Sequence, residues 1–105
     1  MPLLAKLFLL ALAVLPVGCQ SNDSQDVVVA YTTSWCSGCK AQLPPATLWA
    51  KSNGVGLMVE DLTNRPRVAK DAGVHEFPTF VFYRSGVELY RTNDYHDLYV
   101  PIKEN

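Results

Sequence analysis

Two cysteines separated by two residues, Cys36 and Cys39, constrain the fold of this chain more than any other feature. They follow an apolar, β-branched run, Val27 to Tyr31, which predicts a strand buried on both faces. After them, apolar residues recur at mostly helical spacings from Ser37 to Lys51. The dithiol therefore lies where a strand leads into a helix, and Cys36 is expected at the helix N-terminus.

The remaining pattern predicts a small mixed sheet. Pro44 and Pro45 should kink the first helix, because proline removes a backbone donor and clashes with the preceding turn. The other expected elements are a strand from Val55 to Leu62, a helix from Asn64 to Gly73, strands Thr79 to Tyr83 and Val87 to Arg91 joined at Ser85-Gly86, and one or two helical turns from Asp94 with Tyr95, Leu98, Tyr99 and Ile102 on one side. A helical crossover makes the first two strands parallel, and the last two form a hairpin.

The position of the dithiol suits disulfide exchange. The attacking species is a thiolate, and a helix N-terminus can lower a cysteine pKa from about 8.5 to between about 3.5 and 7.5. We therefore expect Cys36 to be the exposed nucleophile. Cys39, one turn further on, can resolve a mixed disulfide by attacking Cys36. Gly38 leaves room for a substrate to approach.

Two simpler roles for the cysteines compete with this one. A purely structural disulfide would close a loop of about four residues and constrain the unfolded chain by only about 2 kcal/mol. A structural zinc ion needs four ligands, and besides the cysteines only His75 and His96 are available. The two histidines do not form a ligand-spaced pair, so we expect no metal site.

At this point the chain resembles the thioredoxin superfamily. Trp35-Cys36-Ser37-Gly38-Cys39-Lys40 is similar to the active-site motif of that family, and Pro44 falls where its kink-forming proline lies. Phe77-Pro78-Thr79 looks like its cis-proline segment, and residues 80–91 look like the hairpin that follows. The resemblance covers roughly residues 27–91. It implies a reduced version of the thioredoxin-like α/β fold, with a central mixed β-sheet flanked by helices.

The resemblance also implies roles for residues around the dithiol. Pro78 would be cis and would face Cys36, and the backbone of Phe77 would pair with an extended substrate segment. Trp35 would cover one side of the dithiol and contact the substrate. The alternatives are a trans Pro78 that merely opens a strand, and a Trp35 that only packs.

The sequence departs from the family pattern in ways that bear on activity. Cytoplasmic thioredoxins carry a buried aspartate where this chain has Ala30, and a lysine where Val59 is expected. Because successive side chains of a strand point to opposite faces of the sheet, only one of Glu60 and Asp61 can face inward. The Ser37-Gly38 dipeptide matches neither reducing thioredoxins nor strong periplasmic oxidants, so the direction of electron transfer stays open. We also expect the domain to lack the family's first strand and helix, and its last helix to be short.

The N-terminus predicts export. Lys6 precedes an apolar run from Leu7 to Leu15, the pattern of a secretory signal. A membrane-spanning helix is the alternative, but a helix from Leu7 to Val17 would rise only about 16 Å, against the roughly 30 Å of a bilayer core.

Leu15-Pro16-Val17-Gly18-Cys19 resembles the lipobox of bacterial lipoproteins, which implies that Cys19 is lipidated. By the same resemblance, Gln20 after the cysteine, in place of the aspartate that retains lipoproteins at the inner membrane, favours the outer membrane. Otherwise Cys19 is a free thiol after an ordinary secretory signal. The expected organisation is a signal peptide over 1–18, the lipidated cysteine and a polar tether over 19–26, and a thioredoxin-like domain over 27–105.

Composition restricts the remaining functions. A chain of 105 residues with net charge −1 has no basic face for nucleic acid. No cofactor motif is present, so the dithiol must be recharged by a redox partner protein. We therefore predict an extracytoplasmic thiol–disulfide oxidoreductase that acts on thiols or disulfides of exported proteins and is anchored to the membrane by lipid. The alternative is a redox-inert thioredoxin-fold module for binding or assembly.

Overall fold

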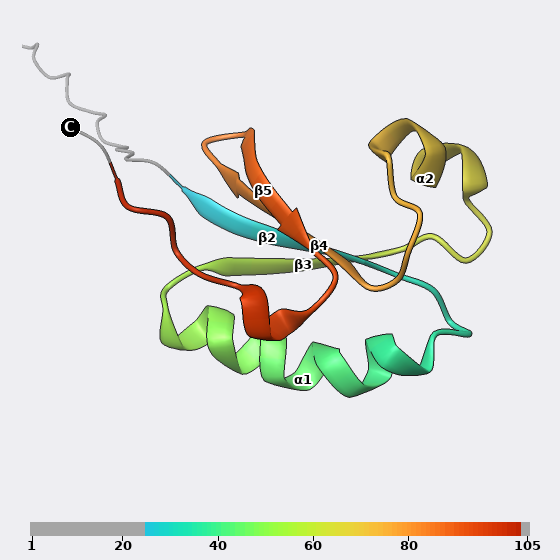
Figure 1. The fold of residues 1–105 in the computed structure, drawn as a ribbon, viewed down its shortest axis with the longest axis horizontal. Helices are drawn as coiled ribbons and strands as arrows, with labels where there is room; N and C mark the ends of the chain where they lie inside the picture. Colours follow the sequence, from blue (N-terminus) through green and yellow to red (C-terminus); the bar gives the residue numbers. More distant parts are fainter. Residues whose placement is uncertain (1–24, 104–105) are drawn as a thin grey trace, which may run out of the picture.

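The computed structural model describes residues 25–103. The predicted signal peptide, Cys19 and most of the predicted tether lie outside the described residues. The elements in chain order are β2 (Asp26–Thr32), α1 (Ser37–Ser52), β3 (Gly56–Asp61), α2 (Pro66–Ala72), β4 (Thr79–Arg84), β5 (Val87–Thr92) and the 3-10 turn η3 (Tyr95–Asp97) (Figure 1). Each predicted strand and both longer helices are present, with ends within a few residues of those expected.

The four strands form one mixed sheet in the order β3-β2-β4-β5. β2 pairs with β3 in parallel and with β4 antiparallel, and β4 pairs with β5 antiparallel. Ser85 and Gly86 both have positive φ angles, 53° and 83°, which suits a tight hairpin between β4 and β5. The expected parallel crossover and hairpin are confirmed.

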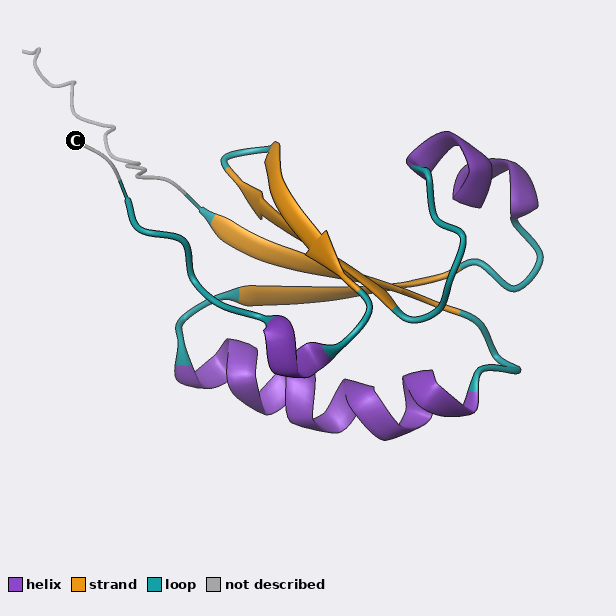
Figure 2. Ribbon diagram, in the orientation of Figure 1, coloured by secondary structure: helices purple, strands orange, loops and turns teal. Residues whose placement is uncertain are grey.

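The core lies between the sheet and α1. It is one cluster of buried side chains from the sheet and the helix. The sheet contributes Val28 and Ala30 of β2 and Phe80 and Phe82 of β4, the helix contributes Ala46 and Ala50, and Val55 and Leu98 complete the cluster. Figures 1 and 2 show α1 and η3 on one side of the sheet, whereas α2 lies beyond the end of β3. A short loop leads from the carboxyl end of β2 to the amino end of α1, and the dithiol lies at this junction.

The prediction that β2 is buried on both faces is wrong. Val28, Ala30 and Thr32 are buried, but the alternate residues Val27, Val29 and Tyr31 are only half-buried. The physical reason is that α2 has no buried residue and does not cover the second face of the sheet.

The first helix continues through both prolines, since α1 runs from Ser37 to Ser52. Pro44 and Pro45 cannot donate to the carbonyls one turn earlier, on Lys40 and Ala41. Both of those residues are exposed, so water can take the place of the missing donors. The helix ends at Asn53, as its cap signal indicates.

The prediction of one or two helical turns from Asp94 is confirmed in part. Only Tyr95–Asp97 form a 3-10 turn, and the chain beyond it is irregular. Leu98 is buried against the core, but Ile102 is 90% exposed, so the apolar residues do not share one side. Tyr99 instead stacks on Tyr90 of β5, with ring centroids 4.4 Å apart.

An ion pair fastens the first strand to the hairpin. Arg84 donates hydrogen bonds to both carboxylate oxygens of Asp26, at 2.8 and 3.1 Å, and a third to the carbonyl of Pro101. The hydrogen bond from Arg84 lowers the pKa of Asp26 below its ordinary value. Asp26, assigned above to the tether, is therefore part of the fold.

Replacing Asp26 with asparagine is expected to destabilise the domain at neutral pH and to matter less in acid. Because the folded-state pKa of Asp26 is lowered, the stabilisation is complete above the unfolded pKa of about 3.9 and is lost as pH falls through the folded-state pKa. Urea unfolding of the wild type and of Asp26→Asn should show a smaller difference in the free energy of unfolding at low pH than at pH 7. A difference that does not change with pH would contradict this role.

Candidate active site

Cys36 is the N-cap of α1, as the sequence predicts. Its backbone is extended, and the N–H of Cys39 donates to Cys36 Sγ at 3.0 Å. The N–H of Cys36 itself donates to the carbonyl of Thr33 at 3.3 Å, which turns the chain from β2 into the helix. The Sγ atom thus faces the unpaired N–H groups and the positive end of the helix dipole, an arrangement that favours a thiolate over a thiol once the pair is reduced.

The two cysteines form a disulfide, with their Cα atoms 5.3 Å apart. Within residues 25–103, no group of three or more His, Cys, Asp or Glu side chains is arranged to hold a metal ion. In the same range, none of the helices has the length and apolar character that a membrane span requires.

The expectation that Cys36 is exposed is wrong. Cys36 is 7% exposed and Cys39 is 2% exposed. The physical reason is the packing around the helix N-terminus, where the chain from β2 and the loop before β4 both reach the disulfide. Cys36 is still the more accessible of the two, so a substrate must approach from its side.

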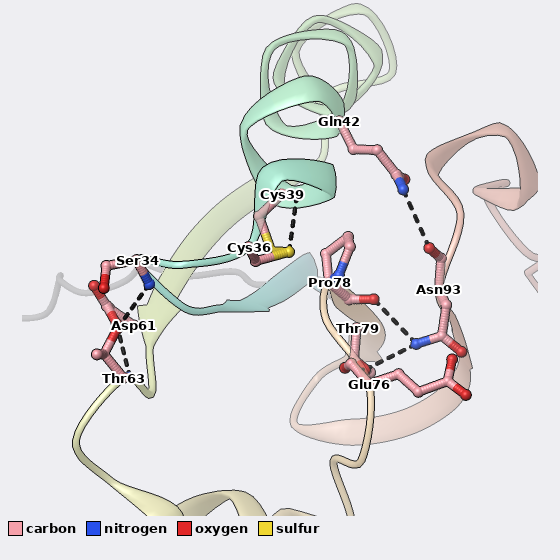
Figure 3. The surroundings of a disulfide bond; sticks show 10 residues. All are labelled: Ser34, Cys36, Cys39, Gln42, Asp61, Thr63, Glu76, Pro78, Thr79 and Asn93. Carbon is pink, nitrogen blue, oxygen red and sulfur yellow. Dashed lines mark hydrogen bonds between the residues drawn. A yellow bond between two sulfur atoms is a disulfide. The ribbon is translucent and has the colours of Figure 1, made fainter.

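The loop before β4 brings Pro78 to the dithiol. The Phe77–Pro78 peptide bond is cis, in agreement with the sequence prediction, and Pro78 lies opposite the disulfide (Figure 3). A Cβ atom on Gly38 would lie 3.9 Å from Pro78 Cδ and 4.0 Å from Cys36 Sγ. Gly38 therefore leaves a gap the size of a methyl group between the proline ring and the sulfur.

Trp35 and Phe77, both predicted to contact substrate, lie together beside the dithiol. Their ring centroids are 5.7 Å apart in an edge-to-face arrangement, and Trp35 is 69% exposed. A groove of about 310 Å³ borders both rings and continues past Leu62, Val74 and Lys70. The structure thus brings together all five predicted site residues of the folded domain, and their catalytic and binding roles stay predictions.

A short polar network supports the loop that carries Trp35. The N–H of Ser34 donates to the hydroxyl of Thr63 at 2.7 Å, and the N–H of Thr63 donates to the carboxylate of Asp61 at 2.9 Å. Hydrogen bonds from Thr63 lower the pKa of Asp61. Sequence reasoning missed this contact, although an Asp-x-Thr turn after a strand is a recognisable signal.

No carboxylate lies beneath the disulfide in the described part of the chain. The strand register pairs Ala30 with Val59, which agrees with the positions inferred from the family pattern. Neither acidic neighbour faces inward: Glu60 makes an ion pair with Arg65 at 3.7 Å, and exposed Asp61 binds Thr63.

Comparisons with known proteins agree with this geometry. The Thioredoxin family model matches residues 19–99. Thioredoxin-1 of Schizosaccharomyces pombe is 30% identical over 64 residues, which cover 60% of this chain and 62% of the yeast protein. Thioredoxin H4 of Arabidopsis thaliana is 32% identical over 85 residues, covering 67% of this chain and 71% of the plant protein.

Solved structures lead to the same family. The X-ray structure of Fasciola hepatica thioredoxin superposes with a TM-score of 0.60 at 28% identity, covering 68% of this chain and 69% of that one. The predicted thioredoxin-like α/β fold is thereby confirmed. Because the family model spans most of the sequence and the dithiol, the cis-proline loop and the sheet order all fit it, the chain belongs to the thioredoxin family.

Proposed function

We propose that this protein is a thiol–disulfide oxidoreductase that exchanges disulfides with protein substrates through Cys36 and Cys39. The observation that carries the proposal is the place of Cys36 Sγ. It caps a 16-residue helix, accepts the N–H of Cys39, and is already bonded to Cys39. A sulfur in this position is both a stabilised thiolate and a good leaving group.

In the reducing direction, exchange proceeds in two displacements. The Cys36 thiolate attacks one sulfur of a substrate disulfide, which forms a mixed disulfide and releases the first substrate thiolate. The Cys39 thiolate then attacks Cys36 Sγ, which restores the Cys36–Cys39 disulfide and releases the second substrate thiolate. Two electrons pass from the dithiol to the substrate. Oxidation of a substrate dithiol is the same sequence in reverse, and a redox partner protein must reset the pair in either case.

The reduction potential of the pair tests the proposal. Equilibration with glutathione or dithiothreitol buffers, read by alkylation of free thiols, should give a potential near or above about −270 mV, because the helix N-terminus stabilises the reduced thiolate. A potential below about −300 mV would contradict exchange activity and would instead be typical of a structural disulfide.

The burial of the disulfide favours a second candidate function. With Cys36 and Cys39 only 7% and 2% exposed, the pair could stay oxidised while the exposed ring of Trp35 and the half-buried ring of Phe77 bind a client or assembly partner. This redox-inert module predicts that the double variant C36S/C39S still binds the client. The oxidoreductase predicts that capture of the client requires Cys36.

For location, we propose that the protein works outside the cytoplasm, on exported proteins, from a lipid anchor at Cys19. The support is the sequence: Lys6, the apolar run to Leu15, and the lipobox-like residues before Cys19. Acyl chains on that cysteine would hold the domain at a membrane, each buried methylene adding about 0.8 kcal/mol.

Expression of the full chain in a bacterium tests the anchor. Wild-type protein should fractionate with membranes and show an acylated Cys19 by mass spectrometry, whereas Cys19→Ala should not be acylated. Cys36→Ala is the matched control, because it also removes a cysteine and should stay in the membrane fraction. A wild-type protein cleaved elsewhere and free of lipid would refute the anchor.

A further inference from the structure

A chain of polar side chains connects the helix that carries the dithiol to the loop that faces it. The amide of Asn93, in the segment after β5, donates hydrogen bonds to the Pro78 carbonyl and to the Thr79 hydroxyl, each at 3.0 Å (Figure 3). The Thr79 hydroxyl donates in turn to the Glu76 carbonyl at 2.6 Å. The backbone on both sides of Phe77 and Pro78 is therefore held by side chains.

Gln42 completes the connection from one turn beyond Cys39. Its side-chain N–H group donates to the backbone carbonyl of Asn93 at 3.4 Å, and its oxygen accepts the N–H of Tyr95 at 2.8 Å. Three segments that are far apart in sequence, α1, the loop before β4 and the segment after β5, are thus tied together beside the disulfide.

The amide of Asn93 has only one orientation that satisfies its neighbours. The Pro78 carbonyl can only accept, and the Thr79 hydroxyl, whose hydrogen is used on Glu76, must accept as well. Both contacts therefore need the two N–H donors of Asn93. Neither an aspartate nor an aliphatic residue at position 93 can supply them.

We propose that Asn93 is a positioning residue for disulfide exchange with protein substrates, and that Gln42 holds it in place. The proposal rests on the proposed function. Its premise is that a protein substrate pairs its backbone with the Phe77–Pro78 segment while its sulfur meets Cys36. Without the Asn93 side chain the Phe77–Pro78 segment is less ordered before the substrate binds. Ordering it on binding then costs entropy, which weakens the binding of a protein substrate.

The structure thus separates two kinds of substrate. A small disulfide needs only Cys36 Sγ, whereas a protein disulfide also needs the ordered backbone beside it. Asn93→Ala is expected to raise KM for a protein disulfide such as that of insulin by about tenfold, with kcat nearly unchanged. The rate with oxidised glutathione and the reduction potential should stay at wild-type values.

Asn53→Ala is the matched control. Asn53 also donates its side-chain amide to a backbone carbonyl, that of Trp49 at 2.8 Å, but at the far end of α1. A general loss of stability would follow from either variant, so Asn53→Ala should leave KM for insulin unchanged even where it lowers the thermal midpoint.

Gln42→Glu keeps the assay informative if Asn93→Ala folds poorly. Glutamate has the same shape and still accepts from Tyr95, but it cannot donate to the Asn93 carbonyl. It should raise KM for insulin by a few-fold, and in Asn93→Ala it should add nothing further.

Equal losses on insulin and oxidised glutathione, or an unchanged KM for insulin in both variants, would overturn the proposal. A wild-type protein inactive on both substrates would instead refute the proposed function. The two failures are therefore distinguishable.

Discussion

Cys36→Ser should abolish disulfide exchange, and Cys39→Ser should trap substrates as mixed disulfides. A serine hydroxyl does not attack disulfide sulfur, so loss of Cys36 removes the nucleophile that caps the helix N-terminus. Loss of Cys39 leaves the first displacement intact and removes the second. We expect insulin reduction by both variants to fall to the uncatalysed rate.

Non-reducing gels distinguish the two variants. After reduction and exposure to an exported disulfide protein, Cys39→Ser should migrate as a covalent complex that dithiothreitol separates by reducing the mixed disulfide. Cys36→Ser should form no such complex. The double variant C36S/C39S controls for non-covalent association. A complex formed equally by Cys36→Ser would place the nucleophile on Cys39 and contradict the assignment drawn from the N-cap.

Phe82→Ala should remove a large part of the stability of the domain. Phe82 is completely buried, stacks on Tyr90 with centroids 5.3 Å apart, and is in the core under α1. Truncation of a buried phenylalanine costs about 3–5 kcal/mol through lost burial and the cavity left behind. Because domains are stable by only about 5–15 kcal/mol, urea unfolding should show a much lower midpoint.

Phe77→Ala is the matched control, since the same atoms are removed from a half-buried ring that contacts Trp35 at the surface. It should change the free energy of unfolding by about 1 kcal/mol or less. Comparable losses in the two variants would mean that the core is not centred between β4 and α1.

Local signals account for the elements that sequence analysis predicted well. Each strand was marked by its own apolar or β-branched run, and the ends of α1 and α2 by Asn53 and Gly73. Such signals act over a few residues, because caps and turns depend on nearby backbone groups. The dithiol and Pro78 were found because their motifs are short and contiguous.

Two of the predictions that failed depended on what another segment covers. The second face of β2 is half-exposed because α2 does not cover it, and Ile102 is 90% exposed because it lies beyond Leu98 and Val100, the tail residues that pack on the core. Apolar pattern reports which residues can be buried, but not whether a partner reaches them. The same limit hid Asn93, an exposed asparagine with no motif around it.

By itself, the sequence determined that Cys36 would begin a helix directly after a strand, because the strand, the N-cap and the helix are contiguous. Only the tertiary structure decided which groups meet that sulfur. Pro78 faces it from about 40 residues further on, and Asn93, about 55 residues further on, holds Pro78 there, after two strands have paired and a hairpin has closed. Contacts of that range depend on topology and packing, which no local pattern of residues encodes.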